Sequence, residues 1–181
     1  MAVTACSGSR DFARPAPQDF ALGRATAADV IGRFGSPQER GRALKDGVEV
    51  LSLSYSYADP TARASAAGVS AAKAMAFYFV RDALVGYEAM STFAADSSDF
   101  DDTRISDIRS GSTTEAQLGE LVGRPSGMYI YPLAPAPGER VLAYAYAQKR
   151  RGAPLARKLL LITVDAAGVV RDVQFEKTGE W

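Results

Sequence analysis

Apolar residues recur at helical spacing in two short stretches of the chain. Val30 and Phe34 lie four positions apart in "TAADVIGRFGSP", and Leu118 and Val122 lie four positions apart in "TEAQLGELVGRP". Side chains at this spacing share one face of an α-helix, while the polar residues between them face away. Each stretch therefore predicts a short amphipathic helix with one buried stripe.

The residues that enclose these stripes are helix start and stop signals in the same register. Thr26 and Thr114 stand where an N-cap hydroxyl accepts a backbone N–H, and Asp29 and Gln117 follow three positions later, as in a capping box. A glycine and, two residues on, a proline close both stretches and prevent the helix from continuing. The matching positions are 88 residues apart without a gap, which indicates a tandem repeat.

After each helix the pattern changes to the alternation of apolar and polar residues that is typical of strands. In "LSLSYSY" the leucines, Tyr55 and Tyr57 share one face, and Tyr144 and Tyr146 occupy the matching places in "LAYAYAQ". Short turns such as Asp46-Gly47 separate the strands, which favours antiparallel hairpins. The prediction is an α+β fold of two tandem repeats, each with short helices packed on a roughly four-stranded antiparallel sheet.

We expect four segments along the chain. Residues 1–19 are predicted to be a lipobox-like start and flexible tether, residues 20–92 the first repeat, residues 93–107 an acidic linker and residues 108–181 the second repeat. The linker is rich in aspartate but lacks the mid-loop glycine and the closing glutamate of an EF-hand. It is interpreted as a solvated linker or helix cap rather than a calcium site.

Composition narrows the chemistry that the chain can perform. Its 181 residues are 47% hydrophobic and carry 21 basic and 21 acidic side chains, so no net charge attracts the chain to nucleic acid. Histidine is absent, which excludes Ser-His-Asp and Cys-His triads and histidine zinc sites. Asp82, Glu88, Asp165 and Asp172 are interpreted as turn or strand-exit residues rather than an acid–base pair. We therefore expect a protein that is not an enzyme and that uses no metal or cofactor.

The only cysteine, Cys6, follows "VTA", and together these residues resemble the bacterial lipobox, in which the thiol receives a diacylglyceryl group. No basic and apolar signal region precedes it, so Met1 is interpreted as a late start that trims a signal peptide. The alternative is an incidental cysteine near a chain end. Ser7, by resemblance to sorted lipoproteins, favours the outer membrane.

Aromatic and basic residues are candidate contacts for partners. Tyrosine is frequent at binding hot spots because it adds a large contact area at low entropic cost, and the alternative for alternating tyrosines is core packing. The basic segment "QKRRGAPLARK" is interpreted as a hairpin tip. A solvated turn that protects a sheet edge is the more common role of such a tip, and contact with anionic lipid headgroups is the functional alternative. The partner-contact candidates are Tyr55, Tyr57, Tyr129, Tyr131, Tyr144, Tyr146 and Trp181, and the anionic-lipid candidates are Lys149, Arg150, Arg151, Arg157 and Lys158.

The second repeat resembles the SmpA/OmlA (BamE-like) family of outer-membrane lipoproteins. Two such units in tandem resemble the fold of the β-lactamase inhibitor proteins, in which two helix-plus-four-strand repeats form a concave sheet surface. The resemblance covers most of residues 20–178, but Ala25 departs from the family pattern in the first half, and one cysteine cannot form the inhibitor proteins' disulfides. The residues that carry the resemblance are Ile108, Gly111, Thr113, Thr114, Leu118, Val122, Gly123, Pro125 and the later "LLLITVDAAGVVRDVQF".

The family resemblance implies a lipid-anchored adaptor at the periplasmic face of the bacterial outer membrane. We therefore expect a cell-envelope protein that acts by protein–protein contacts, with outer-membrane assembly or maintenance as its process. Its expected partners are an envelope protein of unknown identity, the membrane through acylated Cys6, and anionic lipid, but not nucleic acid. Two alternatives stay open: inhibition of a periplasmic enzyme through a concave aromatic sheet face, and binding of a small apolar ligand or lipid.

Overall fold

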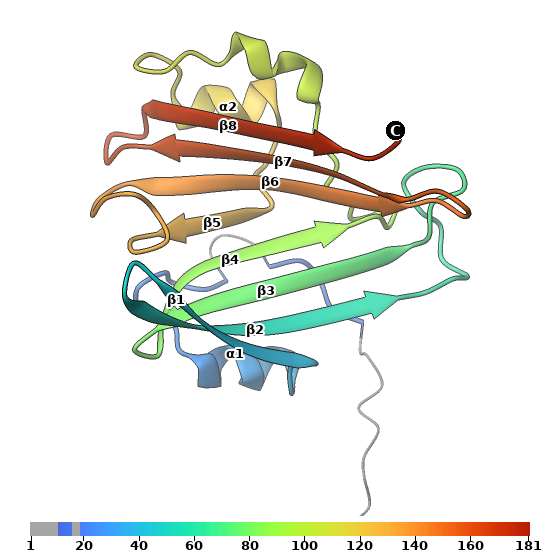
Figure 1. Ribbon diagram of the computed structural model, residues 1–181, viewed down its shortest axis with the longest axis horizontal. Helices are drawn as coiled ribbons and strands as arrows, with labels where there is room; N and C mark the ends of the chain where they lie inside the picture. Colours follow the sequence, from blue (N-terminus) through green and yellow to red (C-terminus); the bar gives the residue numbers. More distant parts are fainter. Residues whose placement is uncertain (1–10, 16–18) are drawn as a thin grey trace, which may run out of the picture.

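The computed structural model describes residues 11–15 and 19–181 of the chain. Within these residues eight strands form one antiparallel sheet, and each strand pairs with the next along the sequence (Figure 1). The elements, in chain order, are α1 (Ala27–Phe34), β1 (Glu39–Lys45), β2 (Val48–Ala58), β3 (Ala72–Val80), β4 (Ala83–Ser91), the 3-10 helix η1 (Asp102–Asp107), α2 (Glu115–Leu121), β5 (Gly127–Ile130), β6 (Arg140–Lys149), β7 (Leu155–Val164) and β8 (Val170–Thr178).

The two halves of the chain repeat one order of elements, a capped helix followed by four antiparallel strands. The fold is mostly sheet, and the two predicted four-stranded units are joined, because β4 pairs with β5 at residues 86–88 and 127–129. Gly127 permits this junction, since a β-carbon there would come within 2.5 Å of the Tyr87 carbonyl oxygen. A single curved sheet thus replaces two separate ones.

Both predicted helices form, and both begin with a capping box. The Asp29 carboxylate accepts the Thr26 N–H at 2.8 Å, while the Thr26 hydroxyl accepts the Asp29 N–H. Gln117 and Thr114 form the same reciprocal pair at the start of α2. These caps fix the first turn of each helix and turn its apolar stripe toward the sheet. No helix within residues 11–15 and 19–181 is long and apolar enough to cross a membrane.

The turns between strands follow the sequence signals. Asp46 and Gly47 have φ values of 50° and 79°, as a two-residue type I′ hairpin requires. Arg81 and Asp82 form the turn between β3 and β4 with φ values of 49° and 68°. Asp165 holds the β7–β8 turn by accepting the N–H groups of residues 167 and 169. Asp82 and Asp165 are therefore turn residues, as predicted.

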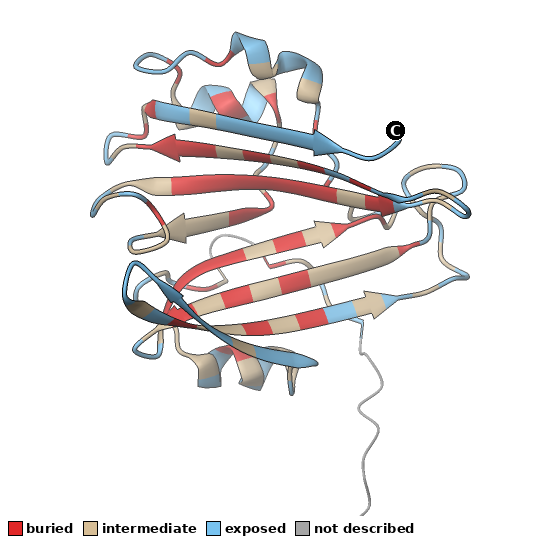
Figure 2. Cartoon of the chain, in the orientation of Figure 1, coloured by how far each residue is buried: buried red, intermediate tan, exposed pale blue. Residues whose placement is uncertain are grey.

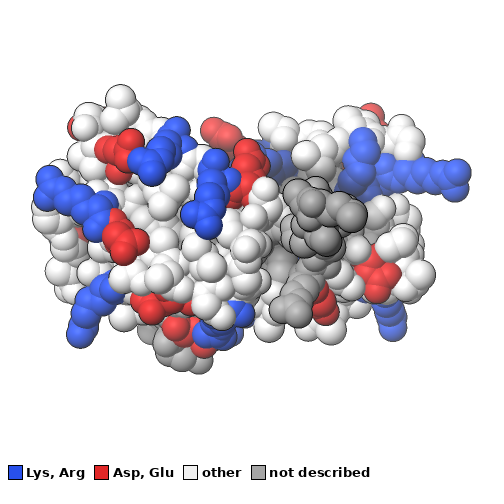
Figure 3. Space-filling view, turned by 90° about the horizontal axis from the view of Figure 1, so that it is seen from below, with Lys and Arg blue, Asp and Glu red and all other residues white. Residues whose placement is uncertain are grey.

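Both α-helices pack on one face of the sheet, termed the helix face, and form a core in each half. Val30 of α1 is fully buried among aromatic residues of β2 and β3, and Leu118 of α2 is fully buried against β6 and β7. The central strands are the most buried, whereas β1 and β8 are mostly exposed (Figure 2). Basic and acidic side chains are interspersed over the side of the molecule seen from below (Figure 3), which is how open sheet edges avoid pairing with other chains.

Two segments that the sequence analysis assigns to a tether and a linker belong to the packed fold. Phe12 packs against the first core and Phe100 is buried in the second. Residues 102–107 of the predicted linker form η1, and Asp101 caps it by accepting the Thr103 N–H, as the helix-cap interpretation of that segment anticipated. The boundaries at residues 20 and 108 are therefore corrected, because side chains that precede them fill the ends of both cores.

Candidate binding face

The face of the sheet opposite α1 and α2, termed the open face, has no helix over it among the described residues (Figure 1). The serines of β2 point to it because they alternate with Leu53 and Tyr55, which are buried on the helix face. On β7, Leu159 and Leu161 point to it because they alternate with the buried Leu160. The side chains on the open face are thus small and polar over β2, in the first half of the sheet, and apolar over β7.

The open face is concave. One hollow of about 380 Å³ is lined by Lys45 of β1 and by Gln174 of β8, which belong to the two opposite edges of the sheet. Its walls are apolar and include Leu159, Leu161 and Leu133, the last from the β5–β6 connection. Side chains from opposite edges reach one hollow only if the sheet curves strongly around it.

Two further hollows continue the first across the open face. One of about 320 Å³ shares Tyr78 and Glu88 with it. The next, of about 430 Å³, shares Met90 and two small neighbours with the second hollow and ends at Leu155. The three hollows form a connected groove, with Glu88 at one junction and Met90 at the other.

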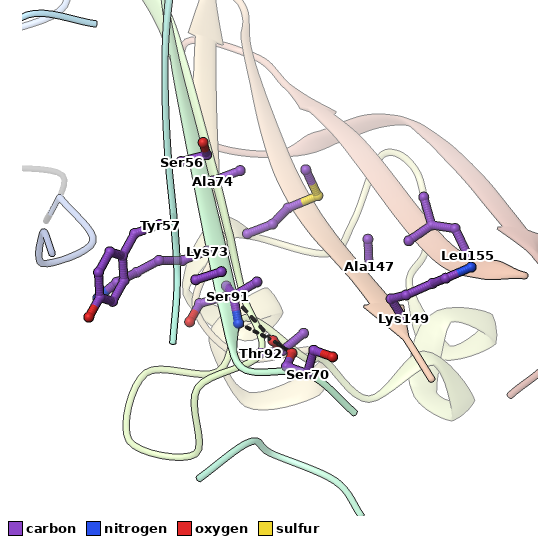
Figure 4. A pocket seen from close by; sticks show the side chains of 13 residues that line it. Ser56, Tyr57, Ser70, Lys73, Ala74, Ser91, Thr92, Ala147, Lys149 and Leu155 are labelled. Carbon is purple, nitrogen blue, oxygen red and sulfur yellow. Dashed lines mark hydrogen bonds between the residues drawn. The ribbon is translucent and has the colours of Figure 1, made fainter. Parts of the chain in front are cut away.

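Figure 4 shows the last of these hollows from close by. Ser56 and Ala74 line one wall, and Ala147 and Leu155 lie across from them. Thr92 closes one end, where its hydroxyl donates to the Ser70 carbonyl at 2.7 Å and accepts the N–H of residue 72. Most of these side chains are small, so the hollow is formed by the sheet itself rather than by a mobile lid.

Glu88 lies near the middle of the groove and is held by two tyrosines. The Tyr78 hydroxyl donates to Glu88 Oε1 at 3.0 Å, and the Tyr129 hydroxyl donates to Glu88 Oε2 at 2.5 Å. The two rings lie side by side with centroids 5.9 Å apart. Because both carboxylate oxygens accept, the arrangement fits the ionised carboxylate.

Burial and the contacts with Glu88 both favour the protonated form of the two phenols. Burial, followed by the charge of Glu88 and the hydrogen bond to it, raises the pKa of Tyr78 and of Tyr129 well above the ordinary value. Arg157 opposes this shift at longer range. Around neutral pH both hydroxyls are therefore donors, and the unit presents one negative charge between two aromatic rings.

Gly86 allows this cluster to form. A β-carbon at residue 86 would lie 2.4 Å from Cδ1 of the Tyr129 ring, so the ring lies directly over the backbone of β4. Any larger residue would displace Tyr129 and separate its hydroxyl from Glu88. The glycine in "LVGYE" thus serves side-chain packing in the middle of a strand rather than a turn.

The seven aromatic residues predicted to contact partners differ in burial and in the face of the sheet on which they lie. Tyr55, Tyr144 and Tyr146 are buried in the cores on the helix face, so the partner-contact prediction is corrected for them in favour of core packing. They lie there because the alternation points them under the helices. Tyr57 is half-buried and stacks on Phe93.

The other three aromatic candidates keep accessible surface. Tyr129 is half-buried and lines the groove. Tyr131 is 51% exposed in the connection after β5. Trp181, at the end of the chain, is 38% exposed and lies beside Tyr146 on the helix face. Among the predicted aromatic contacts, Tyr129 lies beside Glu88 near the middle of the groove, and Tyr57 is among the residues that line its last hollow.

The five basic residues predicted to contact anionic lipid also differ in exposure. Lys149 is exposed at the end of β6 and Arg151 in the hairpin tip, while Arg157 is an exposed residue of β7. Arg150 is half-buried where it bridges Val69. Lys158 is 5% exposed, so the anionic-lipid prediction is wrong for it.

Lys158 is instead an internal ion in the second core. Its ammonium donates to the Phe100 carbonyl at 2.5 Å, pairs with Asp99 at 2.7 Å and lies over the Trp181 ring. This position follows from its place in β7, two residues from Leu160 and therefore on the same, buried face.

Two residues of the groove are missing from the sequence analysis or misassigned by it. Glu88 is in the middle of β4, opposite Gly127, and not at a strand exit, and Asp172 likewise lies within β8. Tyr78 is not among the predicted contacts. One signal in the sequence could have indicated Glu88 and Tyr78. Glu88 is the single carboxylate within the apolar segment "ALVGYEAM", and this segment follows "KAMAFYFV", which contains Tyr78, across a short hairpin turn. The lipidation candidate Cys6 lies outside the described residues.

Comparison with known proteins gives little further information. No protein-family model and no curated protein match the chain. A comparison of structures aligns it with a Streptococcus mutans protein described as a candidate β-lactamase inhibitor protein, at 9% sequence identity and a TM-score of 0.46, over 84% of this chain and 82% of that chain. At this level the likeness carries no conclusion about function, and the SmpA/OmlA resemblance stays a prediction.

Proposed function

We propose that the chain is a lipid-anchored cell-envelope protein that acts by binding another protein in the groove of its open face. The observation that carries the proposal is the groove itself, which is concave, has an apolar hollow beside Leu159 and Leu161, and holds the Glu88 carboxylate between two tyrosines near its middle. Monomeric proteins rarely expose a large contiguous apolar surface without a partner for it. Outer-membrane assembly or maintenance is the process in which we place that binding.

The anchor rests on sequence and is proposed separately. The lipobox-like residues before Cys6 support acylation of its thiol, and the acyl chains of a mature lipoprotein suffice for stable attachment. In cells that make the protein, a Cys6→Ala variant is expected to leave the outer-membrane fraction. A Cys6→Ala variant still found in that fraction would contradict the anchor, whatever the groove binds.

Site-specific photo-crosslinking tests the groove. A photoreactive phenylalanine in place of Leu161 or Met90 is expected to form an adduct with one envelope protein. When that envelope protein carries the affinity tag instead, its purification is expected to capture this chain. Matched probes at Ala28 of α1 and Glu120 of α2, both exposed on the helix side, are expected to give no such adduct. Adducts from the helix probes alone would refute the groove as the binding surface.

The same experiment separates the alternatives. If the crosslinked protein is a periplasmic hydrolase that loses activity on binding, the chain is an enzyme inhibitor. If the probes in the groove label lipid and no protein, the chain is a carrier of small apolar ligands.

A further inference from the structure

At the junction of two hollows the groove contains a carboxylate, Glu88, that the protein itself leaves without an ion pair. Among the described residues, no lysine or arginine nitrogen lies within 4.0 Å of the Glu88 carboxylate, although ten such pairs occur elsewhere on them. Glu88 is half-buried, and its two partners are neutral phenols. A carboxylate in such a site attracts a cation more strongly than one in open water, because less solvent screens it.

From this cluster we infer that the groove recognises a basic side chain, arginine or lysine, on an exposed segment of the protein partner. The inference rests on the proposed function and names the chemistry of the partner. Tyr78 and Tyr129 flank the carboxylate, so an incoming ammonium or guanidinium meets both a negative charge and aromatic rings. Fixing both carboxylate oxygens in advance reduces the entropy lost on binding.

The position of Glu88 sets the register of the partner segment. Glu88 and Tyr78 line two hollows at once, an apolar one with Leu159 and Leu161 and a more polar one with Ser54. A segment that crosses the groove therefore places an apolar side chain in the first hollow and its basic side chain beside Glu88. The pairing of an apolar residue with a nearby basic residue is the expected signature.

The cations of this chain near the groove refine the inference. Lys45 lines the apolar hollow and Arg157 acts on both phenols at longer range. Arg157 is exposed, so its guanidinium is free to move into the solvent when a partner approaches. Both cations repel a basic ligand, and removal of Arg157 is therefore expected to strengthen binding, opposite in sign to removal of the Glu88 charge.

Peptide display tests the inference with the full chain. We would select a library of random twelve-residue peptides on the protein and measure the affinity of the enriched peptides for variants. Enriched peptides are expected to carry an arginine or lysine near an apolar residue and to bind Glu88→Gln at least about tenfold more weakly. Glu120→Gln, the same substitution at an exposed position of α2 on the helix side, is the matched control and is expected to leave affinity within twofold. Arg157→Gln is expected to raise it.

The outcomes separate this inference from the proposed function. Peptides that lose binding with Leu161→Arg but lack a basic residue, or that bind Glu88→Gln as well as the parent, overturn the basic-residue inference and leave the groove as a protein-binding site. Acidic enriched peptides also overturn it. A library that yields no peptide dependent on the groove counts against both. Glu88-dependent binding of phosphatidylcholine vesicles without peptide binding would assign the site to a lipid headgroup instead.

Folding of the variants is checked independently. Glutamine is nearly the size of glutamate and still accepts a hydrogen bond from a phenol, so Glu88→Gln is expected to fold. Tyr129→Phe removes one hydroxyl and keeps the ring and the charge. It is expected to weaken peptide binding less than Glu88→Gln does, and an equal or larger loss would mean that the phenol rather than the carboxylate makes the contact.

Discussion

Lys73 in the first half and Lys158 in the second occupy the same structural position, and Lys73 is half-buried while Lys158 is buried. Lys73 pairs across the sheet with Tyr57, and Lys158 pairs with Tyr146. Each ammonium lies over the ring of a phenylalanine that precedes the helix of its half. In both halves a lysine therefore closes the end of the core by packing its stem on aromatic rings.

The two sites differ in how firmly the lysine is held. Lys73 has one acidic partner, Asp11, which is 65% exposed. Lys158 pairs with Asp99, lies 3.6 Å from Asp102 and donates to a carbonyl. The pKa of Asp102 lies below its usual value, mainly because Lys177 donates a hydrogen bond to it. Burial opposes this shift, and the charge of Lys158 adds to it. The second site is a network, whereas the first is a single pair at the surface.

The internal repeat includes residues that precede the helix in each half. Asp11-Phe12 and Asp99-Phe100 are 88 residues apart, the same offset that relates the two N-cap threonines. Both dipeptides bring a carboxylate and a ring to the equivalent lysine. The repeated unit therefore begins before its helix, and the second copy makes contacts that the first lacks.

Removal of the phenylalanine ring is expected to have the largest effect and to separate the two halves most clearly. Phe100 is 7% exposed, so Phe100→Ala is expected to lower the free energy of unfolding by about 3 kcal/mol. Phe12 is only partly buried, and Phe12→Ala is expected to cost about half as much. Urea unfolding followed by circular dichroism measures both. Equal losses would show that the two core ends are packed alike.

Removal of the lysine charge is expected to have the next largest effect. Lys158→Met keeps most of the stem but leaves the Phe100 carbonyl and Asp99 without their donor, which is expected to cost about 2 kcal/mol. Lys73→Met is expected to cost less than about 1 kcal/mol, because water already reaches Asp11. The control is Lys158→Met combined with Asp99→Asn, which is expected to recover part of the loss. Greater sensitivity at Lys73 would reverse the comparison.

Local signals made the elements predictable, whereas the groove depends on pairing between distant segments. The capping boxes and the Asp46-Gly47 turn involve residues at most three positions apart, so the sequence carries them directly. Tyr129 meets Glu88 only because β5 pairs with β4 across the junction of the halves, 41 residues away along the chain. The alternation of apolar and polar residues also predicts which side chains share a face of the sheet, but it does not predict which face the helices cover. That arrangement buries Tyr55 and places the serines of β2 on the open face.

The smallest expected effect concerns the one chemical difference between the two capping boxes, Asp29 in the first half and Gln117 in the second. Hydrogen bonds from Thr26, first its N–H and then its hydroxyl, lower the pKa of Asp29. Its contribution to stability is therefore present above the unfolded value of about 4 and is lost as pH falls through the folded value. Gln117 does not titrate, so of the two capping boxes only the first is expected to be weakened in acid, at the hydrogen bonds that the Asp29 carboxylate accepts.

Reciprocal substitutions isolate this difference from the titration of all other carboxylates. The stability difference between the parent and Asp29→Asn, measured by urea unfolding, is expected to shrink between pH 6 and about pH 3. Gln117→Glu is expected to introduce the same acid dependence into the second half, with a slight gain near neutral pH from a negative charge at the helix N-terminus. If Asp29→Asn leaves the pH dependence unchanged, Thr26 caps the helix alone, and the two halves differ at their lysines but not at their helix starts.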